Sequence, residues 1–412
     1  MKSRQSWLVK KIRYFFQYRL TPIGRMAVLL MFMSATGLIT VEIPIYQLFC
    51  GIVLLFGVIE FVGNIFRPRL KLTAAFPERV AAGETVLGTV TIHNLGYFPA
   101  CDLMCGCFML PNEIQHLNAR DMVPVLVRGD HATLPVKLET IRRGQYAIPG
   151  IWVHSTFPLN FMRIGNVPVP FSKLLVVPAY HRLEQLHLPV SHRFQHGGVL
   201  SESRSGSAAE YSGNREYIPG EPTKRLDFRA WARVGKPVVR EYQEEYCSRV
   251  AIVLDTQVDQ FWKWPTKQAR QELEAAISLT AAMADALDHQ GMTLELFAAG
   301  PDLFFFEANS LSSTYVDSIL EILASVEPTF NNPFDQLSPA IRESLESTSV
   351  VICLFLDWDE SREELVNQIV QSGCGYRNFL IRERPATRPF PQDDYHVVLS
   401  PKGILEGDTC LL

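Results

Sequence analysis

The sequence predicts a multi-domain protein: a transmembrane helical hairpin, then a small antiparallel β sandwich, then a doubly wound α/β domain. At 412 residues, the chain is too long for a single compact core. Two long apolar stretches lie near the N-terminus, and short β-type runs separated by turn residues follow them. The C-terminal part alternates apolar strands with amphipathic helices. Each pattern indicates a different structural unit.

The two apolar stretches, Met26–Val41 and Leu48–Phe66, predict membrane spans over residues 26–66. A spanning helix needs about 20 apolar residues. The second stretch reaches this length, and the first does so only when its ends are included. A buried hairpin of a soluble domain is the alternative interpretation, but neither stretch has an amphipathic pattern. We therefore expect two transmembrane helices in contact with membrane lipid.

The charges around these stretches predict the orientation of the chain. Residues 1–25 hold seven basic side chains and no acidic one, and three more basic residues follow the second stretch by residue 71. The connector between the stretches carries only Glu42. The positive-inside rule therefore places residues 1–25 and everything after residue 67 in the cytoplasm. Glu60 is the only acid inside the second stretch, where it either pairs with a polar group or lies near the cytoplasmic end.

Residues 67–180 are predicted to form the β sandwich, because short β-type runs alternate here with Gly, Pro, Asn and Asp. The predicted strands are Thr85–Gly96, Met122–Asp130, Ala132–Glu139, Gly144–Ser155 and Lys173–Pro178. Cys105 and Cys107 would share one face of a further strand as small buried residues. The eight cysteines include no C-x-x-C pair, so they indicate neither a zinc site nor a redox motif.

Residues 181–212 are rich in glycine and serine and are predicted to form a flexible linker. Residues 246–412 predict the α/β domain. The expected strands include the fully apolar runs "RVAIVLD" and "VVICLFLD", and amphipathic helical patterns lie between and after them. Such alternation is typical of a parallel sheet with helices on both faces.

Both of these apolar strands end in acids, which makes Asp255, Asp259, Asp357 and Asp359 candidate ligands. Ligands of open α/β sheets bind at the carboxyl ends of strands, and hard cations take oxygen ligands. The pattern resembles the von Willebrand factor A fold, whose metal site uses D-x-S-x-S after the first strand. Asp255 matches, whereas Gln257 and Asp259 replace the two serines, so Mg²⁺ or Ca²⁺ would bind a degenerate site of Asp255, Gln257, Asp259 and Asp357. Alternatively, these acids lie at exposed strand ends or cap helices.

Residues 213–245 form a polar and aromatic segment between the linker and the α/β domain. Residues 218–221 suit a type II turn. Arg225–Val234 is predicted to form a short helix that buries Phe228, Trp231 and Ala232 and stops at Gly235. The segment holds seven basic and six acidic side chains, so it lacks the excess of base that nucleic-acid binding requires. Balanced charges around aromatic residues fit either an intramolecular clamp or a protein interface.

The same segment resembles a bacterial family, domain of unknown function 58. Its members carry an arginine–glutamate–tyrosine, proline–glycine–acid signature, then a tryptophan and an alanine–arginine pair, then a domain similar to von Willebrand factor A. "RRGQY" (Arg142–Tyr146) resembles a second family element. The residues of the segment that we expect to serve in interaction or structure are Arg215, Glu216, Tyr217, Pro219, Gly220, Arg225, Asp227, Trp231, Arg233 and Glu241.

This resemblance implies an adaptor that partners a MoxR-type AAA+ ATPase, or the clients of that ATPase, in a chaperone-like or envelope-related assembly. It also implies the bacterial inner membrane as the location. No G-x-S-x-G, H-E-x-x-H or Walker A motif is present, so we predict no enzymatic activity. Two alternatives stay open: a metal-dependent binding module or hydrolase that uses the strand-end carboxylates, and a structural envelope protein.

Overall fold

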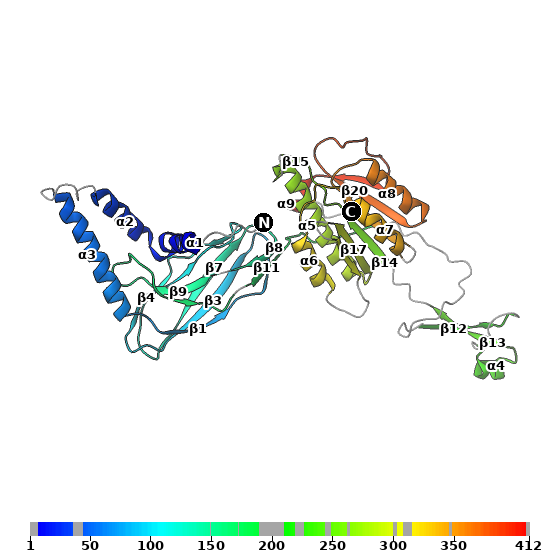
Figure 1. The fold of residues 1–412 in the computed structure, drawn as a ribbon. Coiled ribbons are helices and arrows are strands. Elements are labelled where there is room, and N and C mark those ends of the chain that lie inside the picture. The colour runs from blue at the N-terminus through cyan, green and yellow to red at the C-terminus, as the bar shows by residue number, and fades with distance from the viewer. Residues whose placement is uncertain are drawn as a thin grey trace. The chain divides into compact units, whose positions relative to one another are not determined.

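The computed structural model describes residues 7–35, 44–148, 150–171, 173–188, 210–218, 226–243, 249–261, 264–299, 303–307, 315–345 and 348–408. The chain divides into two compact units, each with its own core (Figure 1). The first is Met1–Ala179 with Leu320–Ser325, and the second is Tyr180–Ile319 with Val326–Leu412. The fold is thus multi-domain, with mixed helix and sheet content.

The N-terminal helices are α1 (Trp7–Tyr14), the π-helical turn η1 (Phe15–Arg19), α2 (Pro22–Ser34) and α3 (Pro44–Ile65). Thr21 caps α2 by accepting a hydrogen bond from Gly24 N, and Pro22 occupies the first turn. Among the described residues, one helix is long and apolar enough to cross a membrane, namely α3 over Ile45–Ile65. At about 1.5 Å per residue, its 22 residues extend about 33 Å.

The prediction of two spans is therefore supported for one helix only. Helix α2 has 13 described residues, which extend about 20 Å and fall short of a membrane core of about 30 Å. The predicted first span, Met26–Val41, also covers residues 36–41, which lie outside the described residues.

Glu60 pairs with a basic side chain from the segment that precedes α2. Both of its carboxylate oxygens accept hydrogen bonds from Arg19 Nη2, at 2.5 and 2.7 Å. Asn64 Nδ2 donates a further bond at 3.3 Å. The acid within the apolar helix is therefore neutralised by a charge-assisted pair, as polar groups in apolar surroundings require.

Three sheets form the β sandwich, with strand orders β1-β3-β7-β5, β10-β9-β4-β6 and β2-β11-β8. All pairings are antiparallel except β2 with β11. The strands are β1 (Leu70–Ala75), β2 (Arg79–Ala81), β3 (Thr85–Asn94), β4 (Ala100–Cys107), β5 (Ile114–His116), β6 (Met122–Leu126), β7 (His131–Thr140), β8 (Gly144–Ala147), β9 (Ile151–Ser155), β10 (Ile164–Pro168) and β11 (Lys173–Val177). Burial alternates along β3 and β7, and their inward residues build the core. The predicted sandwich-like antiparallel architecture is confirmed.

The predictions for the run Gly144–Ser155 and for Cys105 and Cys107 can be compared with the sandwich. The expected strand Gly144–Ser155 is wrong as one element, because β8 and β9 belong to different sheets. Cys105 and Cys107 do share one face of β4, where Cys105 is buried in the core and Cys107 is partly buried against it. Burial raises the pKa of the Cys105 thiol, which therefore stays protonated and acts as a small apolar side chain.

Tyr18 of η1 joins the N-terminal segment to the sandwich. Its side chain is 1% exposed, and its ring lies 4.7 Å from Trp152 and 5.8 Å from His154, measured between centroids. The Tyr18 hydroxyl lies 3.3 Å from His154 Nδ1. Burial lowers the pKa of His154 to about 3, so this imidazole is neutral. Backbone pairing of Leu20 with Met162 continues the attachment.

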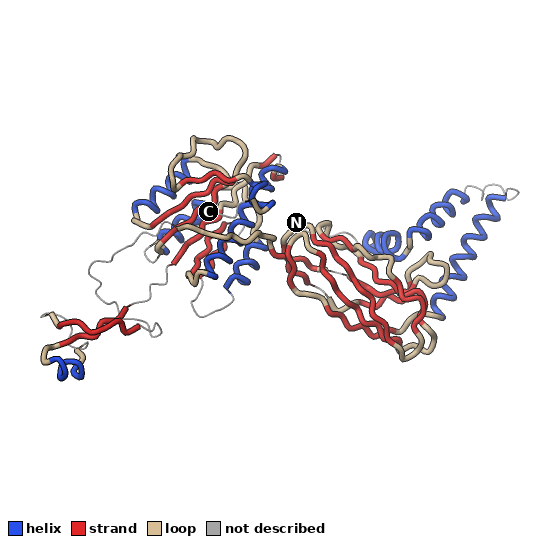
Figure 2. Tube along the Cα trace, turned by 180° about the vertical axis from the view of Figure 1, so that it is seen from behind, coloured by secondary structure: helices blue, strands red, loops and turns tan. Residues whose placement is uncertain are grey.

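The second unit holds a six-stranded sheet of order β18-β17-β14-β19-β20-β21, in which only β18 pairs antiparallel. Its strands are β14 (Arg249–Leu254), β17 (Thr293–Ala299), β18 (Leu303–Glu307), β19 (Val350–Phe355), β20 (Gly375–Ile381) and β21 (His396–Leu399), and its helices are α5 (Lys267–His289), α6 (Tyr315–Ser325), α7 (Phe334–Ser344), α8 (Glu360–Gln371) and α9 (Pro401–Glu406). A short hairpin, β15 (Gln260–Phe261) and β16 (Trp264–Pro265), follows β14. Helices α7 and α8 cover one face, and α5 covers the other (Figures 1 and 2). The predicted parallel sheet with helices on both faces is present, with one antiparallel edge strand.

The segment before β14, which belongs to the second compact unit, forms a small hairpin unit with a helix. Strands β12 (Glu210–Glu216) and β13 (Val238–Gln243) pair as an antiparallel hairpin, and α4 (Phe228–Val234) lies between them in sequence. Asp227 caps α4, because its Oδ1 accepts hydrogen bonds from Arg229 N and Ala230 N, each at 3.0 Å. Gly235 ends the helix in the left-handed region, with φ 73°. The helix stops where the sequence predicted and starts three residues later.

Candidate functional site

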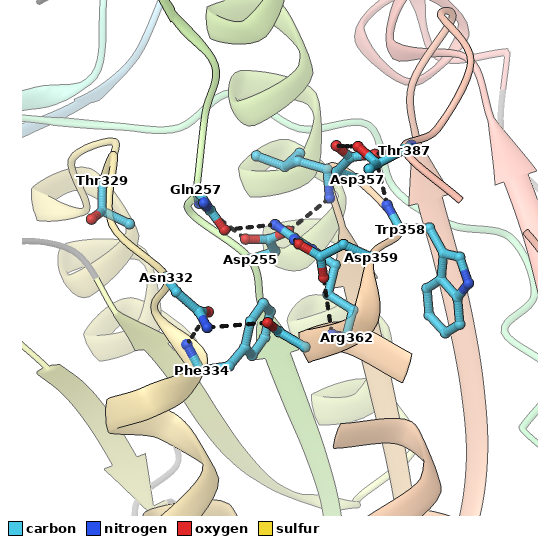
Figure 3. Close-up of polar contacts among 12 residues, drawn as sticks. Asp255, Gln257, Thr329, Asn332, Phe334, Asp357, Trp358, Asp359, Arg362 and Thr387 are labelled. Atoms are coloured by element: carbon cyan, nitrogen blue, oxygen red, sulfur yellow. Dashed lines mark hydrogen bonds and ion pairs between the residues drawn. The ribbon is translucent and has the colours of Figure 1, made fainter. Parts of the chain in front are cut away.

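Two candidate sites follow from the sequence: the strand-end carboxylates and the segment with α4. The carboxylates gather at the carboxyl edge of the sheet, because β14 and β19 are parallel neighbours (Figure 3). Asp255 follows β14 and is 0% exposed. Its Oδ1 accepts a hydrogen bond from Gln257 N at 2.9 Å, and its Oδ2 accepts one from Leu356 N at 3.0 Å. Asp255 thus ties the loop after β14 to the end of β19.

Arg362 of α8 fills the space between these acids, and its side chain is 2% exposed. Its Nε and Nη2 bind Asp255 Oδ2 at 2.8 and 2.7 Å, and its Nη1 binds Asp359 Oδ2 at 2.5 Å. Nη2 also donates to Gln257 Oε1 at 3.2 Å. The guanidinium lies 5.2 Å from the ring centroid of Phe334. Burial alone would lower the pKa of Arg362, but Asp255 and Asp359 raise it above its ordinary value, so the group stays charged.

Two further arginines, which follow β20, neutralise the remaining acids. Arg382 Nη1 contacts Asp357 Oδ1 at 2.5 Å, and its Nη2 lies 3.8 Å from Asp259 Oδ2. Arg384 contacts Asp259 and binds Glu272 of α5 through Nη2 and Oε2 at 2.9 Å. Burial would raise the pKa of Asp357, but hydrogen bonds from Arg382 and from Thr387 hold it below the ordinary value.

This arrangement does not fit the predicted Mg²⁺ or Ca²⁺ site. All four predicted ligands contact a guanidinium: Asp255 and Gln257 contact Arg362, Asp357 contacts Arg382, and Asp259 contacts Arg384. Among the described residues, no group of three or more His, Cys, Asp or Glu side chains is placed to hold a metal ion. The alternative role as a helix cap is confirmed for Asp359, whose Oδ1 accepts from Arg362 N at 3.1 Å.

The sequence did contain a signal for these missed arginines. The runs "DESREEL" and "IRER" place Arg362, Arg382 and Arg384 just after β19 and β20. The carboxyl ends of parallel strands meet at one edge, so acids and bases that follow neighbouring strands come together there. Arg362 was missed because a polar residue in the first turn of a helix is usually solvent-exposed.

The second candidate site is the small unit with α4. Arg215 and Glu216 lie on β12, Tyr217 follows it, and Glu241 lies on β13 opposite Gly213. The Glu216 carboxylate pairs with Lys236 Nζ at 2.9 Å. Trp231 and Arg233 belong to α4 and Asp227 caps it, whereas Pro219, Gly220 and Arg225, like most of the predicted turn, lie outside the described residues.

The expectation that α4 buries its apolar side is wrong for the described structure. Phe228 is 67% exposed and Trp231 is 37% exposed, and Ala232 is also exposed. The two aromatic rings stack with centroids 6.0 Å apart, and the exposed Val234 lies one turn further along the same side. Helical spacing had identified residues that share a face, but it carries no information on what covers that face. We call Phe228, Trp231 and Val234 the α4 face.

Three solved structures that resemble this chain do so only distantly. No curated protein matches the chain. The CARDB domain of the PF1109 protein from Pyrococcus furiosus is 14% identical over 27% of this chain and 89% of that one, with a TM-score of 0.18. Native E. coli alpha-2-macroglobulin is 10% identical over 74% of this chain and 16% of that one, with a TM-score of 0.22. A GH20 exo β-N-acetylglucosaminidase from Vibrio harveyi is 8% identical over 76% of this chain and 57% of that one, with a TM-score of 0.17. Similarities this distant assign neither fold nor function.

A family model gives a more specific result. Its match begins within β12, covers α4 and β13, and continues through the α/β sheet as far as Arg362. It therefore includes the α4 face, and it also includes Asp255 together with the arginine that binds it. Residues 213–362 of this chain thus match the family described as Protein of unknown function DUF58, which supports the resemblance seen in the sequence over that part of the chain.

Proposed function

We propose that this chain is a membrane-anchored, non-catalytic adaptor that uses the α4 face to bind a cytoplasmic AAA+ ATPase of the MoxR type or a client of that ATPase. The observation that carries the proposal is the exposed, stacked pair of Phe228 and Trp231 within the segment that matches the family model. The partner follows from what the family resemblance implies. The resemblance of the α/β domain to von Willebrand factor A belongs to the same proposal.

The chemistry of the α4 face supports a protein partner. Aromatic residues and arginine are enriched in protein–protein interfaces, and Arg229 and Arg233 are exposed on the same helix. A helix of seven residues and a two-stranded hairpin gain little stability on their own, so apolar contacts with another surface would stabilise this unit. Seven basic and six acidic residues over 213–245 give a nearly neutral segment, which disfavours nucleic acid.

The sheet edge supports a non-catalytic role. A general base or a metal ligand needs a carboxylate that is available to substrate or metal. At this edge Asp255, Asp259 and Asp357 are engaged by guanidinium groups. This geometry favours the adaptor over a metal-dependent module or hydrolase.

The proposed location is the bacterial inner membrane, with two passes and the bulk of the chain in the cytoplasm. Helix α3 and the basic residues before it support this orientation. We expect a C-terminal green fluorescent protein fusion to be fluorescent and a C-terminal alkaline phosphatase fusion to be inactive. Alkaline phosphatase inserted within residues 42–47 should be active, because this connector would face the periplasm. An active C-terminal phosphatase would contradict the proposed topology.

The direct test uses the full chain in detergent micelles as bait for the purified ATPase, which is held in its nucleotide-bound state. Changing both Phe228 and Trp231 to alanine is expected to weaken binding by roughly three orders of magnitude, because two buried aromatic hot spots of about 2 kcal/mol each contribute about 4 kcal/mol together. Val370→Ala is the matched control, since Val370 is an exposed apolar residue of helix α8. Equal binding by the double variant and the wild type would reject the α4 face as the docking surface.

A deletion of the β sandwich tests the alternative of a structural envelope protein. In the adaptor proposal the β sandwich is not the docking surface. Deleting residues 70–180 should therefore leave ATPase binding intact. Loss of binding, with the α/β unit still folded by circular dichroism, would point to the sandwich as the binding domain.

A further inference from the structure

We infer that the guanidinium of Arg362 takes the place of a divalent cation at the carboxyl edge of the sheet, so that this edge is held together without metal. Three oxygen atoms accept hydrogen bonds from the guanidinium: Asp255 Oδ2, Asp359 Oδ2 and Gln257 Oε1 (Figure 3). Two carboxylate oxygens and an amide carbonyl oxygen are the ligands that a hard divalent cation takes in proteins. Here one positively charged side chain of the protein binds all three.

The fit of the guanidinium is close. Its Nε, Nη1 and Nη2 all donate to this set, with nitrogen–oxygen distances between 2.5 and 3.2 Å. The planar fork of arginine matches carboxylate geometry better than a compact ammonium does. The Phe334 ring lies beside it, and both Arg362 and Asp255 are buried. A metal ion could reach the same oxygens only by displacing this side chain.

The sequence of the loop after β14 agrees with this substitution. In the D-x-S-x-S pattern that the loop resembles, small hydroxyls leave room for an ion. Gln257 instead extends an amide oxygen towards Arg362, and Asp259 contacts Arg384. The residues present therefore fit an arginine and do not fit a divalent ion. The carboxyl edge is predicted to keep its structure whether or not Mg²⁺ or Ca²⁺ is present.

The test compares the temperature at which the α/β unit unfolds within the full chain in detergent micelles, followed by hydrogen exchange of the β14 and β19 amides, in EDTA and in millimolar Mg²⁺, Mn²⁺ or Ca²⁺. The wild type should unfold at the same temperature in all four buffers. Arg362→Ala should unfold at a lower temperature in EDTA, and divalent cations should restore a few degrees, because the three oxygens are then available to an ion. The double variant Asp255→Asn with Arg362→Met removes one carboxylate together with the guanidinium, and should not respond to cations.

Each outcome decides the inference. A cation-dependent rise in the unfolding temperature of the wild type would show that the edge binds metal with Arg362 present, and would overturn it. An Arg362→Ala protein that is equally stable, or equally unfolded, with and without cations would also overturn it, because the oxygens would then form no cation site. A similar response of the double variant would place the cation elsewhere and count against the inference. This test does not depend on any partner, so its failure is separate from failure of the adaptor proposal.

Discussion

Replacing Arg362 with alanine is expected to lower the free energy of unfolding of the α/β unit by about 3–5 kcal/mol, the usual cost of removing one member of a buried ion pair. Asp255 is fully buried and would lose the guanidinium that binds its Oδ2. It would keep its bonds from Gln257 N and Leu356 N, which do not neutralise its charge. Because Asp255 joins β14 to β19, we expect the loss of stability to be largest at the centre of the sheet.

Hydrogen exchange of the β14 and β19 amides measures this effect directly. Exchange reports the stability of each element separately, whereas unfolding of a multi-domain chain is not a single two-state transition. The loss of protection should be confined to the second unit, and amides of β3 and β7 in the sandwich should exchange as in the wild type. Uniform loss across both units would indicate general misfolding.

Two variants control for the loss of packing by the long arginine side chain. Arg362→Lys keeps a positive charge but loses the planar fork, so it should lie between the wild type and alanine. Changing Asp255 to asparagine together with Arg362 to methionine removes both buried charges at similar volume, and such replacements are often close to neutral. If the double variant is as unstable as Arg362→Ala, the lost hydrogen bonds of the guanidinium, and not an unpaired charge or lost packing, explain the effect.

The acids of this site could be predicted from the sequence, but their partners were not. Asp255 and Asp357 follow apolar strands, so strand periodicity alone places them at one edge of a parallel sheet. Which basic side chain pairs with each acid depends on the rotation of α8 about its axis and on the path of the chain after β20. Both are set by packing against the sheet, as in the contacts of Leu365 and Ile369. Arg362, Arg382 and Arg384, which follow the strand ends in sequence, pair with these acids and so have a structural role.

The fold was predictable where burial follows a local period, and unpredictable where pairing is non-local. The fully apolar β14 and β19 are typical of central parallel strands, and β3 and β7 alternate as half-buried strands do. The run from Gly144 to Ser155 contains Pro149-Gly150, a turn signal that the prediction of one strand overlooked, and its halves pair in different sheets. The prediction that α4 buries its apolar side was wrong for a related reason. Amphipathic spacing shows which residues share one side of a helix, but not which surface that side contacts.

The largest effect expected in the first unit comes from Tyr18→Ala. Removing a buried aromatic side chain costs about 3–5 kcal/mol, and this ring contacts Trp152 and His154 of β9 and also Phe108. Tyr18 belongs to η1, which leads directly into α2, so this cluster fixes the start of α2 to the sandwich. We therefore expect local detachment of the N-terminal segment while the sandwich stays folded.

Protection of the Leu20 and Arg163 amides measures this attachment, because Leu20 N donates to Phe15 O and Arg163 N donates to Arg19 O. Both amides should exchange much faster in Tyr18→Ala, and those of β3 and β7 should not change. Tyr18→Phe keeps the ring and loses only the contact with His154 Nδ1, so it should cost about 1 kcal/mol. Since His154 is neutral, neither change leaves an unpaired charge on it, and the difference between the variants measures the packing of the ring together with its contact with the Arg163 guanidinium, 4.7 Å from the ring centroid. Unchanged exchange of Leu20 and Arg163 in Tyr18→Ala would mean that backbone pairing with residues 162 and 163 alone holds the N-terminal segment in place.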